Sequence, residues 1–402
     1  MDEARDEPLR PDVAAELDKL SELLDAATHP SEVESLMRQA LAVTEASFGP
    51  DDPDVAFHLF DLALFLQAME RLLESEPLMR RALAIHETAY GANHPEVASD
   101  LNMLASLLKA ANRLSEAETL VRRALAISEA SCGTDHPDVA RDLNHLAALL
   151  QAANRLSEAE PLMRRAMAIH EAHFGSDDPE IASDLNNLAQ LLQDTDRLSE
   201  SEPLMRRALA IDEAAYGPDH PEVATDLNNL AQLLQDTGRL LDAEPLMRRA
   251  LVIDEASDGP NHLNVAIRLN NLAVLLKRMN RLSEAEPLMR RALAIDEATY
   301  GPDHPEVAMD LNNLAQVLLA ANKLSDAELL MRQALSTFLN SRPKTEHDTQ
   351  NMMSIAVNYL NMLEEMGVPE DERMDRLESA LSAGEPLPRK PGRKPGSKHI
   401  RR

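Results

Sequence analysis

The sequence predicts an all-α solenoid of about eight to nine antiparallel helix pairs. A block of 42 residues recurs along almost the whole chain, and such repetition is typical of solenoids. Each block holds two runs in which apolar residues follow the helical i, i+3/i+4 spacing. Glycine recurs at positions 49, 91, 133, 175, 217, 259 and 301, and proline at 53, 95, 137, 179, 221 and 305, with Leu263 in the remaining slot.

The unit at 221–262 shows how each helix is predicted. Its first helix begins at Pro221, whose missing N–H costs nothing in a first helical turn. The apolar stripe of this helix is Val223, Leu227, Leu230, Ala231 and Leu234. Gly238 then reverses the chain in a left-handed backbone conformation, and its equivalents are Asn112, Asn154, Asp196, Asn280 and Asn322. The second helix turns Leu246, Met247, Ala250, Leu251 and Ile253 inward and ends at Gly259.

Four segments are expected along the chain. An N-terminal arm at 1–10 precedes eight 42-residue units over 11–346. A degenerate helix pair at 347–383 has lost the periodic glycine, as an end cap would, and a disordered basic tail follows at 384–402. At the start of the second helices, Ser115 precedes Glu118 at the spacing of a capping box, and Ser157, Ser199 and Ser283 repeat the pattern. The alternative is a helix that starts a residue or two away, because a proline usually follows the glutamate, as at Pro161.

Composition narrows the class of protein. The chain is 44% hydrophobic and 27% charged but only 2% aromatic, which favours closely packed Leu, Ala, Met and Val. A single cysteine forms no internal disulfide, so we expect a cytoplasmic protein, and the acidic N-terminus does not resemble a signal peptide. No apolar run is long enough for a membrane span. The net charge of −29 should repel nucleic acid and attract basic partners.

The sequence holds no recognisable catalytic motif. There is no HExxH, zinc-type CxxC pair, phosphate loop or nucleophile elbow, so we expect no enzyme activity, no cofactor and no metal. His94, His136, His220, His262 and His304 recur one per unit in a turn, about 10 Å apart if neighbouring helix pairs stack normally. Cys132 is isolated in the sequence. The paired arginines of the second helices, such as Arg248 four residues after Glu244, predict intrahelical ion pairs.

The small-residue pattern resembles the tetratricopeptide (TPR) signature. Leu227, Leu230, Ala231, Leu234, Ala243, Met247 and Ala250 match it in order and spacing. The longer period and the phrases LNNLA, EAEPLMRRAL and YGPDHPEVA resemble the repeats of kinesin light chains and nephrocystin-3. The resemblance covers about 11–346. It implies a right-handed superhelix that acts as a scaffold or adaptor and binds an extended peptide or partner protein in its concave groove.

The resemblance places the first helix of each pair along that groove, where asparagines and glutamines line the free face. The first asparagine of each unit is Asn102, Asn144, Asn186, Asn228, Asn270 or Asn312, and the second is Asn187, Asn229, Asn271 or Asn313. Gln190, Gln232 and Gln316 follow on the same face. An amide offers both donor and acceptor to a peptide backbone. The alternative is that the first asparagine bridges neighbouring helices.

The second unit replaces these polar residues with Phe57, Phe60 and Leu64. An exposed apolar cluster there would be a pocket for an apolar anchor of the partner. The alternative is that the first unit or the N-terminal arm covers it. Basic residues also reach the predicted groove, namely Lys109, Arg141, Lys277 and Arg278, either to clamp acidic groups or as solvated or paired side chains.

A second function class comes from the tail. Residues 384–402 hold seven Lys or Arg against one acid, and PGRKPG resembles an AT-hook, which enters the minor groove of A·T-rich DNA. On this reading Arg389, Lys390, Arg393 and Lys394 contact nucleic acid and the chain is a nucleic-acid-associated regulator. The other readings are a solubilising tail and an arm held by the acidic solenoid.

Overall fold

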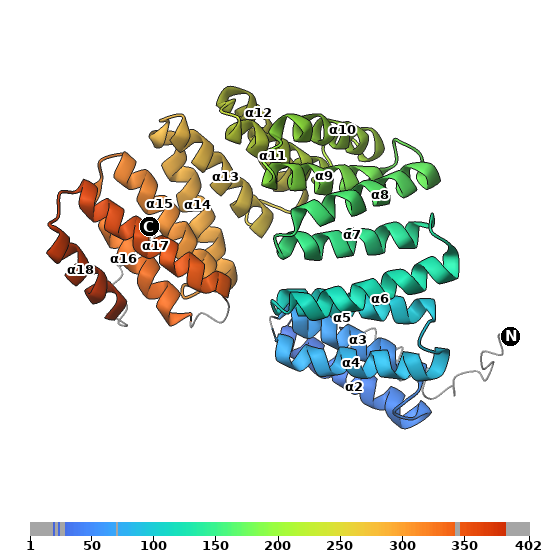
Figure 1. The fold of residues 1–402 in the computed structure, drawn as a ribbon. Coiled ribbons are helices and arrows are strands. Elements are labelled where there is room, and N and C mark those ends of the chain that lie inside the picture. Colours follow the sequence, from blue (N-terminus) through green and yellow to red (C-terminus); the bar gives the residue numbers. More distant parts are fainter. Residues whose placement is uncertain (1–18, 21–22, 25–28, 70, 342–345, 383–402) are drawn as a thin grey trace, which may run out of the picture. The chain divides into compact units, whose positions relative to one another are not determined.

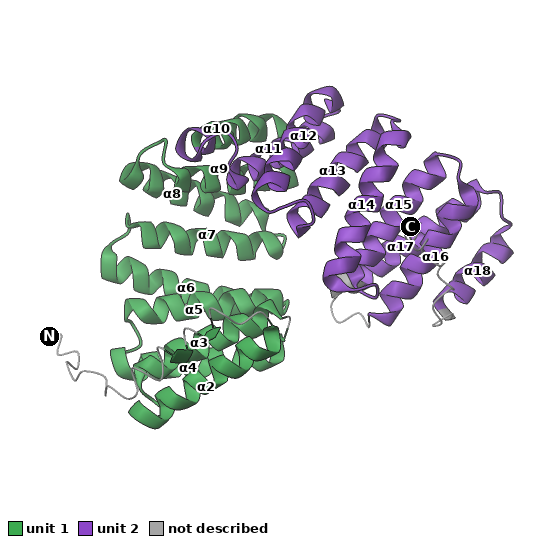
Figure 2. Ribbon diagram, turned by 180° about the vertical axis from the view of Figure 1, so that it is seen from behind, with its two compact units in different colours: residues 1–211 green, residues 212–402 purple. Residues whose placement is uncertain are grey.

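The computed structural model describes residues 19–20, 23–24, 29–69, 71–341 and 346–382. Within these residues it contains seventeen α-helices stacked in antiparallel pairs, which confirms the predicted all-α fold (Figure 1). The chain forms two compact units, Met1–Ile211 and Asp212–Arg402 (Figure 2). The N-terminal arm, the basic tail and most of the first helix of the unit at 11–52 lie outside the described residues.

The helices alternate between a shorter first and a longer second member of each pair. The first helices are α3 (Pro53–Ala68), α5 (Pro95–Ala110), α7 (Pro137–Ala152), α9 (Pro179–Asp194), α11 (Pro221–Asp236), α13 (Leu263–Arg278) and α15 (Pro305–Ala320). The second helices are α2 (Pro30–Phe48), α4 (Leu72–Tyr90), α6 (Leu114–Cys132), α8 (Leu156–Phe174), α10 (Leu198–Tyr216), α12 (Leu240–Ser257), α14 (Leu282–Tyr300) and α16 (Leu324–Asn340). Two further helices follow, α17 (Glu346–Glu365) and α18 (Glu370–Ser382).

Local chemistry sets the helix boundaries. Asn112 adopts the left-handed conformation at φ 57°, and the amide of Arg113 then closes the turn onto the Leu108 carbonyl at 2.8 Å. The recurring turn histidines are N-caps: Nδ1 of His94 accepts from the amide of Glu96 at 3.3 Å. The predicted capping box is wrong. The second helix α6 begins at Leu114, so Ser115 lies inside the first turn and its hydroxyl caps no amide.

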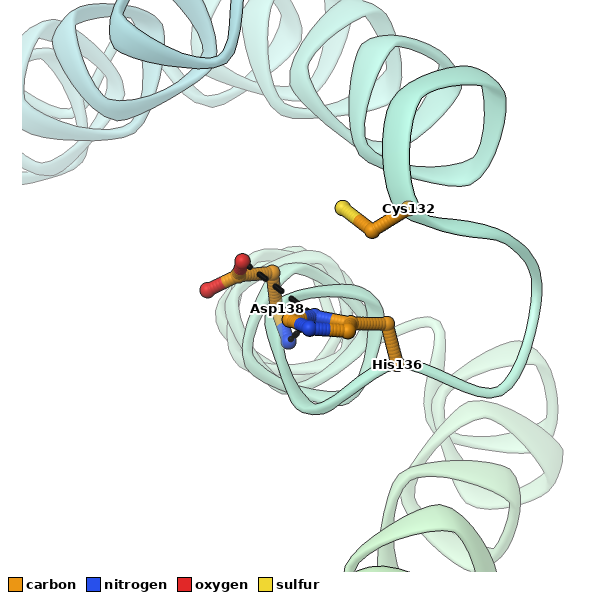
Figure 3. A group of neighbouring side chains, drawn as sticks. All are labelled: Cys132, His136 and Asp138. Carbon is orange, nitrogen blue, oxygen red and sulfur yellow. Dashed lines mark hydrogen bonds and ion pairs between the residues drawn. The ribbon is translucent and has the colours of Figure 1, made fainter.

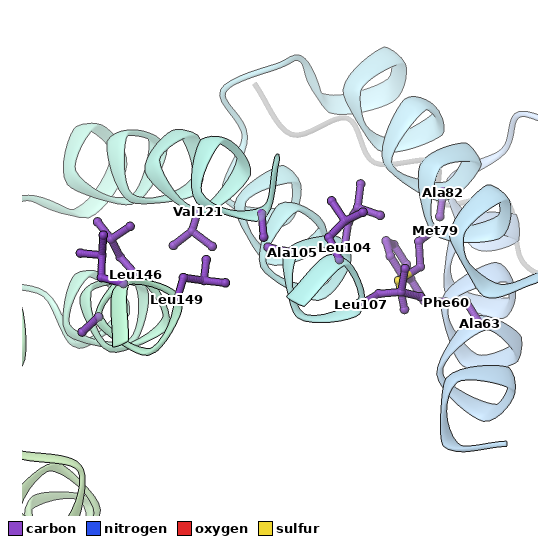
Figure 4. Close-up of a cluster of buried hydrophobic side chains, with 14 of the residues drawn as sticks. Phe60, Ala63, Met79, Ala82, Leu104, Ala105, Leu107, Val121, Leu146 and Leu149 are labelled. Carbon is purple, nitrogen blue, oxygen red and sulfur yellow. The ribbon is translucent and has the colours of Figure 1, made fainter. Parts of the chain in front are cut away.

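The core continues from pair to pair. In the N-terminal unit one cluster of buried side chains runs from α3 to α9, and Figure 4 shows part of it around Leu104, Leu107 and Val121. Each first helix packs against its own partner, and most second helices also pack against the first helix of the next pair. Because neighbouring pairs within a compact unit bury apolar surface against one another, the stability of a pair depends on the stack.

The paired arginines bind within and between pairs. The first arginine of each pair makes the predicted intrahelical contact, as between Arg248 and Glu244 at 2.8 Å. The second arginine reaches the preceding pair: Nη1 of Arg123 lies 2.5 Å from Glu87, and Nη2 donates to the Ala92 carbonyl at 2.7 Å. Glu255 occupies the same position as Glu87 and binds Arg291. The acid at this position therefore joins successive second helices.

Candidate ligand-binding face of the first helices

The first asparagines lie in a buried polar layer between neighbouring first helices. Nδ2 of Asn102 donates to Oδ1 of Asp142 at 2.6 Å, and Asn144 makes the same bond to Asp184 at 2.6 Å. Asn270 repeats the contact with Asp310 at 2.5 Å. These three asparagines therefore bridge neighbouring helices, which was the alternative to ligand binding in the sequence analysis. These three amides are already engaged in contacts between successive 42-residue repeats.

A second partner from the preceding second helix completes the layer. Ser128 donates to the other oxygen of Asp142 at 2.6 Å, and Nδ1 of His170 lies 2.7 Å from Asp184. The bond with Asp184 raises the pKa of His170 against the opposing effect of burial. In a later pair the aspartate position is Arg268, which binds Asp254 at 2.7 Å. The chemistry of the partner varies, but the contact between the pairs is kept.

The aspartates of this layer were missed in the sequence. Each lies 40 residues after the asparagine that binds it, a spacing two short of the repeat. That offset, together with the polar residue 14 positions before the aspartate, is the signal that would have identified the bridge.

The second asparagines fall into two groups, two without a hydrogen-bond partner in the described part of the chain and two that bond to a first asparagine. Asn187 is exposed and Asn229 is half-buried, and neither has a hydrogen-bond partner among the described residues. Nδ2 of Asn271 donates to Oδ1 of Asn228 at 2.9 Å, and Asn313 accepts a 3.3 Å bond from Asn312. The face of the first helices thus keeps accessible amides after the bridges are formed.

The glutamines continue that face. Gln232 is exposed and has no partner among the residues described. Gln190 is exposed and donates to Asp194 on its own helix at 3.1 Å. Gln316 accepts from Lys277 at 2.8 Å, which joins α15 to α13.

The residues of the predicted apolar anchor pocket do not all lie on one exposed face. Phe60 is only 4% exposed and belongs to the core, so its placement with Phe57 on one open face is wrong. Phe57 is 50% exposed and meets His86 edge-on, with ring centroids 5.4 Å apart, and Leu64 is 45% exposed. The alternative was a cover by the first unit or the N-terminal arm. The arm and most of the first helix of that unit lie outside the described residues, whereas α2, its second helix, packs against α3.

The basic residues of the first helices have different surroundings. Lys109 and Arg278 are exposed, and Arg141 pairs with Asp138 at 2.9 Å. Burial lowers the pKa of Lys277. The four tail residues predicted to touch nucleic acid lie beyond the described part of the chain.

A family model described as tetratricopeptide repeat matches residues 56–130, 116–172, 180–255, 227–298 and 284–340. No curated protein matches the chain. Within the described parts of the chain, no helix combines the length and apolar character needed to cross a bilayer.

Several solved structures are similar. The apo quorum sensor NprR from B. thuringiensis is 11% identical with a TM-score of 0.58, covering 92% of this chain and 99% of that one. A STAND protein of Pyrococcus horikoshii with a tetratricopeptide repeat sensor is 13% identical with a TM-score of 0.53, covering 91% and 48%. TPR-like repeats from a kinesin light chain candidate of Podosopora anserina are 23% identical with a TM-score of 0.45, covering 51% and 98%.

Proposed function

Because the chain belongs to the tetratricopeptide repeat family, we propose that it is a non-enzymatic scaffold that binds an extended segment of a partner protein along its first helices. The family is generally one of protein-interaction repeats. The observation that supports this site is that the first and second asparagines of a repeat have different surroundings. The first asparagines Asn102, Asn144 and Asn270 are engaged in bridges. Asn187, Asn229 and Gln232 are accessible and have no partner among the described residues.

The chemistry of these amides suits a peptide backbone. Each side chain can donate to a carbonyl and accept from an N–H of an extended ligand. One such hydrogen bond contributes about 0.5–1.5 kcal/mol, so several acting together are needed for a useful affinity. The net charge of −29 favours a basic partner and speeds its encounter at low ionic strength.

We expect replacement of all four second asparagines by alanine (N187A, N229A, N271A and N313A) to weaken peptide binding by at least about tenfold. The probe is a peptide selected from a random displayed library against the intact chain, and its Kd is measured by fluorescence anisotropy. The melting temperature should fall only modestly, because Asn187 and Asn229 make no hydrogen bond among the described residues, and Asn271 and Asn313 each give up one side-chain bond to a first asparagine.

The matched control replaces four exposed serines at the start of the second helices (S157A, S199A, S283A and S325A). This variant should bind the peptide as the wild type does. Equal loss of affinity in both variants would contradict a site on the first helices. A large fall in melting temperature for the asparagine variant would assign those residues a structural role instead.

The basic tail supports a second candidate function, a regulator that touches nucleic acid while its repeats recruit protein. Deleting 384–402 should then abolish retention on DNA at low salt, because seven of the chain's basic residues lie there. Retention is measured by gel shift with A·T-rich duplexes at increasing salt. Unchanged retention after the deletion excludes this function.

A further inference from the structure

Cys132 departs from the repeat at a position that normally covers a histidine. The equivalent residues Tyr90, Tyr216 and Tyr300 lie against the N-cap histidine of the following helix, with ring centroids 4.9, 4.6 and 4.3 Å apart. Asp258 takes this position before His262 and pairs with it at 3.3 Å. At the end of α6 the equivalent residue is Cys132, so a thiol replaces the aromatic ring. The imidazole of His136 is therefore left without the tyrosine that covers it elsewhere.

The thiol lies next to two other metal-ligating groups. The sulfur of Cys132, a ring nitrogen of His136 and a carboxylate oxygen of Asp138 all lie within 4.8 Å of one another, and the three side chains converge in Figure 3. Nδ1 of His136 is 3.3 Å from Oδ2 of Asp138. The thiol is thus not isolated, contrary to the prediction from the sequence.

A second departure from the repeat occurs at the same place. His173, on α8, has its ring centroid 6.3 Å from that of His136. Its equivalents in the other units are the small residues Ser47, Ala89, Ser131, Ala215, Ser257 and Thr299. Two changes from the repeat pattern, 41 residues apart in the sequence, therefore surround one imidazole.

We propose that Cys132, His136 and Asp138 bind a divalent transition-metal ion of the zinc class. A thiolate, an imidazole and a carboxylate are ligands that Zn²⁺ accepts, and three protein ligands leave a fourth tetrahedral position for water. Tetrahedral bonding places ligand atoms about 3.5 Å apart. Side-chain rotations that move these ligand atoms by roughly 1 Å therefore assemble the site. Binding releases the thiol proton.

The surrounding groups are compatible with this change. The thiol now donates to the Ser128 carbonyl at 3.2 Å, a weak bond that metal binding replaces. Nδ1 of His136, which lies next to Oδ2 of Asp138, accepts from the Asp138 amide at 3.2 Å, and metal binding at this nitrogen replaces that bond. Arg141 holds Oδ1 of Asp138 at 2.9 Å and leaves Oδ2 facing the histidine. The ion would join the end of α6 to the start of α7.

The test is titration of the chelator-treated full chain with Co²⁺, followed by competition with Zn²⁺. We expect one ion per chain and the thiolate-to-cobalt charge-transfer absorption that only a bound cysteine produces. Cys132→Tyr restores the residue of the neighbouring units, so it should fold normally, lose that absorption and bind at least about tenfold more weakly. Zn²⁺ should raise the melting temperature of the wild type and not that of C132Y.

The matched control is His94→Ala, which removes the equivalent histidine of the preceding unit, where Tyr90 occupies the cysteine position. This variant should keep the full stoichiometry and the absorption. The proposal is overturned if the wild type shows no stoichiometric thiolate band, if C132Y binds as tightly as the wild type, or if H94A loses binding to the same extent.

Discussion

Raising the pH from about 4 to about 8 is expected to destabilise the C-terminal compact unit, and Asp310→Asn should remove much of that loss. Asp310 is only 4% exposed, and burial beside the carboxyl of Asp296 raises its pKa to about 8. Oδ1 of Asp296 and Oδ2 of Asp310 are buried, and a proton shared between the carboxyls satisfies both.

The sign of the effect follows from proton binding. An unfolded aspartate loses its proton near pH 4, whereas the folded pair keeps one until about 8. Between those values the folded state binds more protons than the unfolded state, so stability falls as the pH rises. The slope for one proton is about 1.4 kcal/mol per pH unit, and the contribution is constant outside the window.

The measurement is urea unfolding of wild type and D310N across this range, because the difference between the two cancels other titrating groups. An asparagine at 310 can still accept from Asn270 and can donate to Asp296 without ionising. Asp303→Asn, at an exposed turn position before α15, is the control and should follow the wild type. Parallel pH profiles for wild type and D310N would contradict the shared proton.

Replacing Asp184 by alanine is expected to cost about 3–5 kcal/mol in the N-terminal compact unit. The carboxylate accepts from Asn144 and pairs with His170, so the substitution leaves a partly buried amide and a buried imidazole without their partner. It also removes the group that raises the pKa of His170, and a buried imidazolium without a carboxylate is unstable. The loss should appear in urea unfolding and as faster amide exchange in α8 and α9.

Asp194→Ala is the matched control on the same helix. Asp194 is exposed, and within the described part of the chain its side chain accepts from the amides of Gln151 and Gln190, so its loss should change stability by less than about 0.5 kcal/mol. Similar losses for D184A and D194A would show that the buried bridge contributes little. Asp184→Asn is expected to fall between them, because an amide can still accept from Asn144.

The fold was predictable because single residues determine where its helices begin and end. A positive φ at Asn112 and a proline in the first turn of a helix follow from the chemistry of single residues. The capping box failed because the helix begins one residue before Ser115, a difference that spacing alone cannot reveal.

The candidate sites were less predictable because they depend on how the pairs stack. Whether Asn144 faces a ligand or Asp184 depends on the register between two first helices. The same holds for Phe60, whose periodicity allows both the open face and the core. The group around Cys132 comes from two elements, because Cys132 ends α6 and the turn before α7 brings His136 and Asp138 to it.

The bridges between pairs also determine how the chain can change length. Arg123 binds Glu87 across 36 positions, and Asn102 binds Asp142 across 40, so each contact crosses one unit boundary. Insertion or removal of a whole 42-residue block preserves every such offset and regenerates the contacts at the new junction. An insertion whose length is not a multiple of the repeat would change the offset of the contacts that span it. The protein can therefore be lengthened by whole repeats without new contacts between pairs. Cys132 and His173, which occur in single repeats, would remain at one position in the stack.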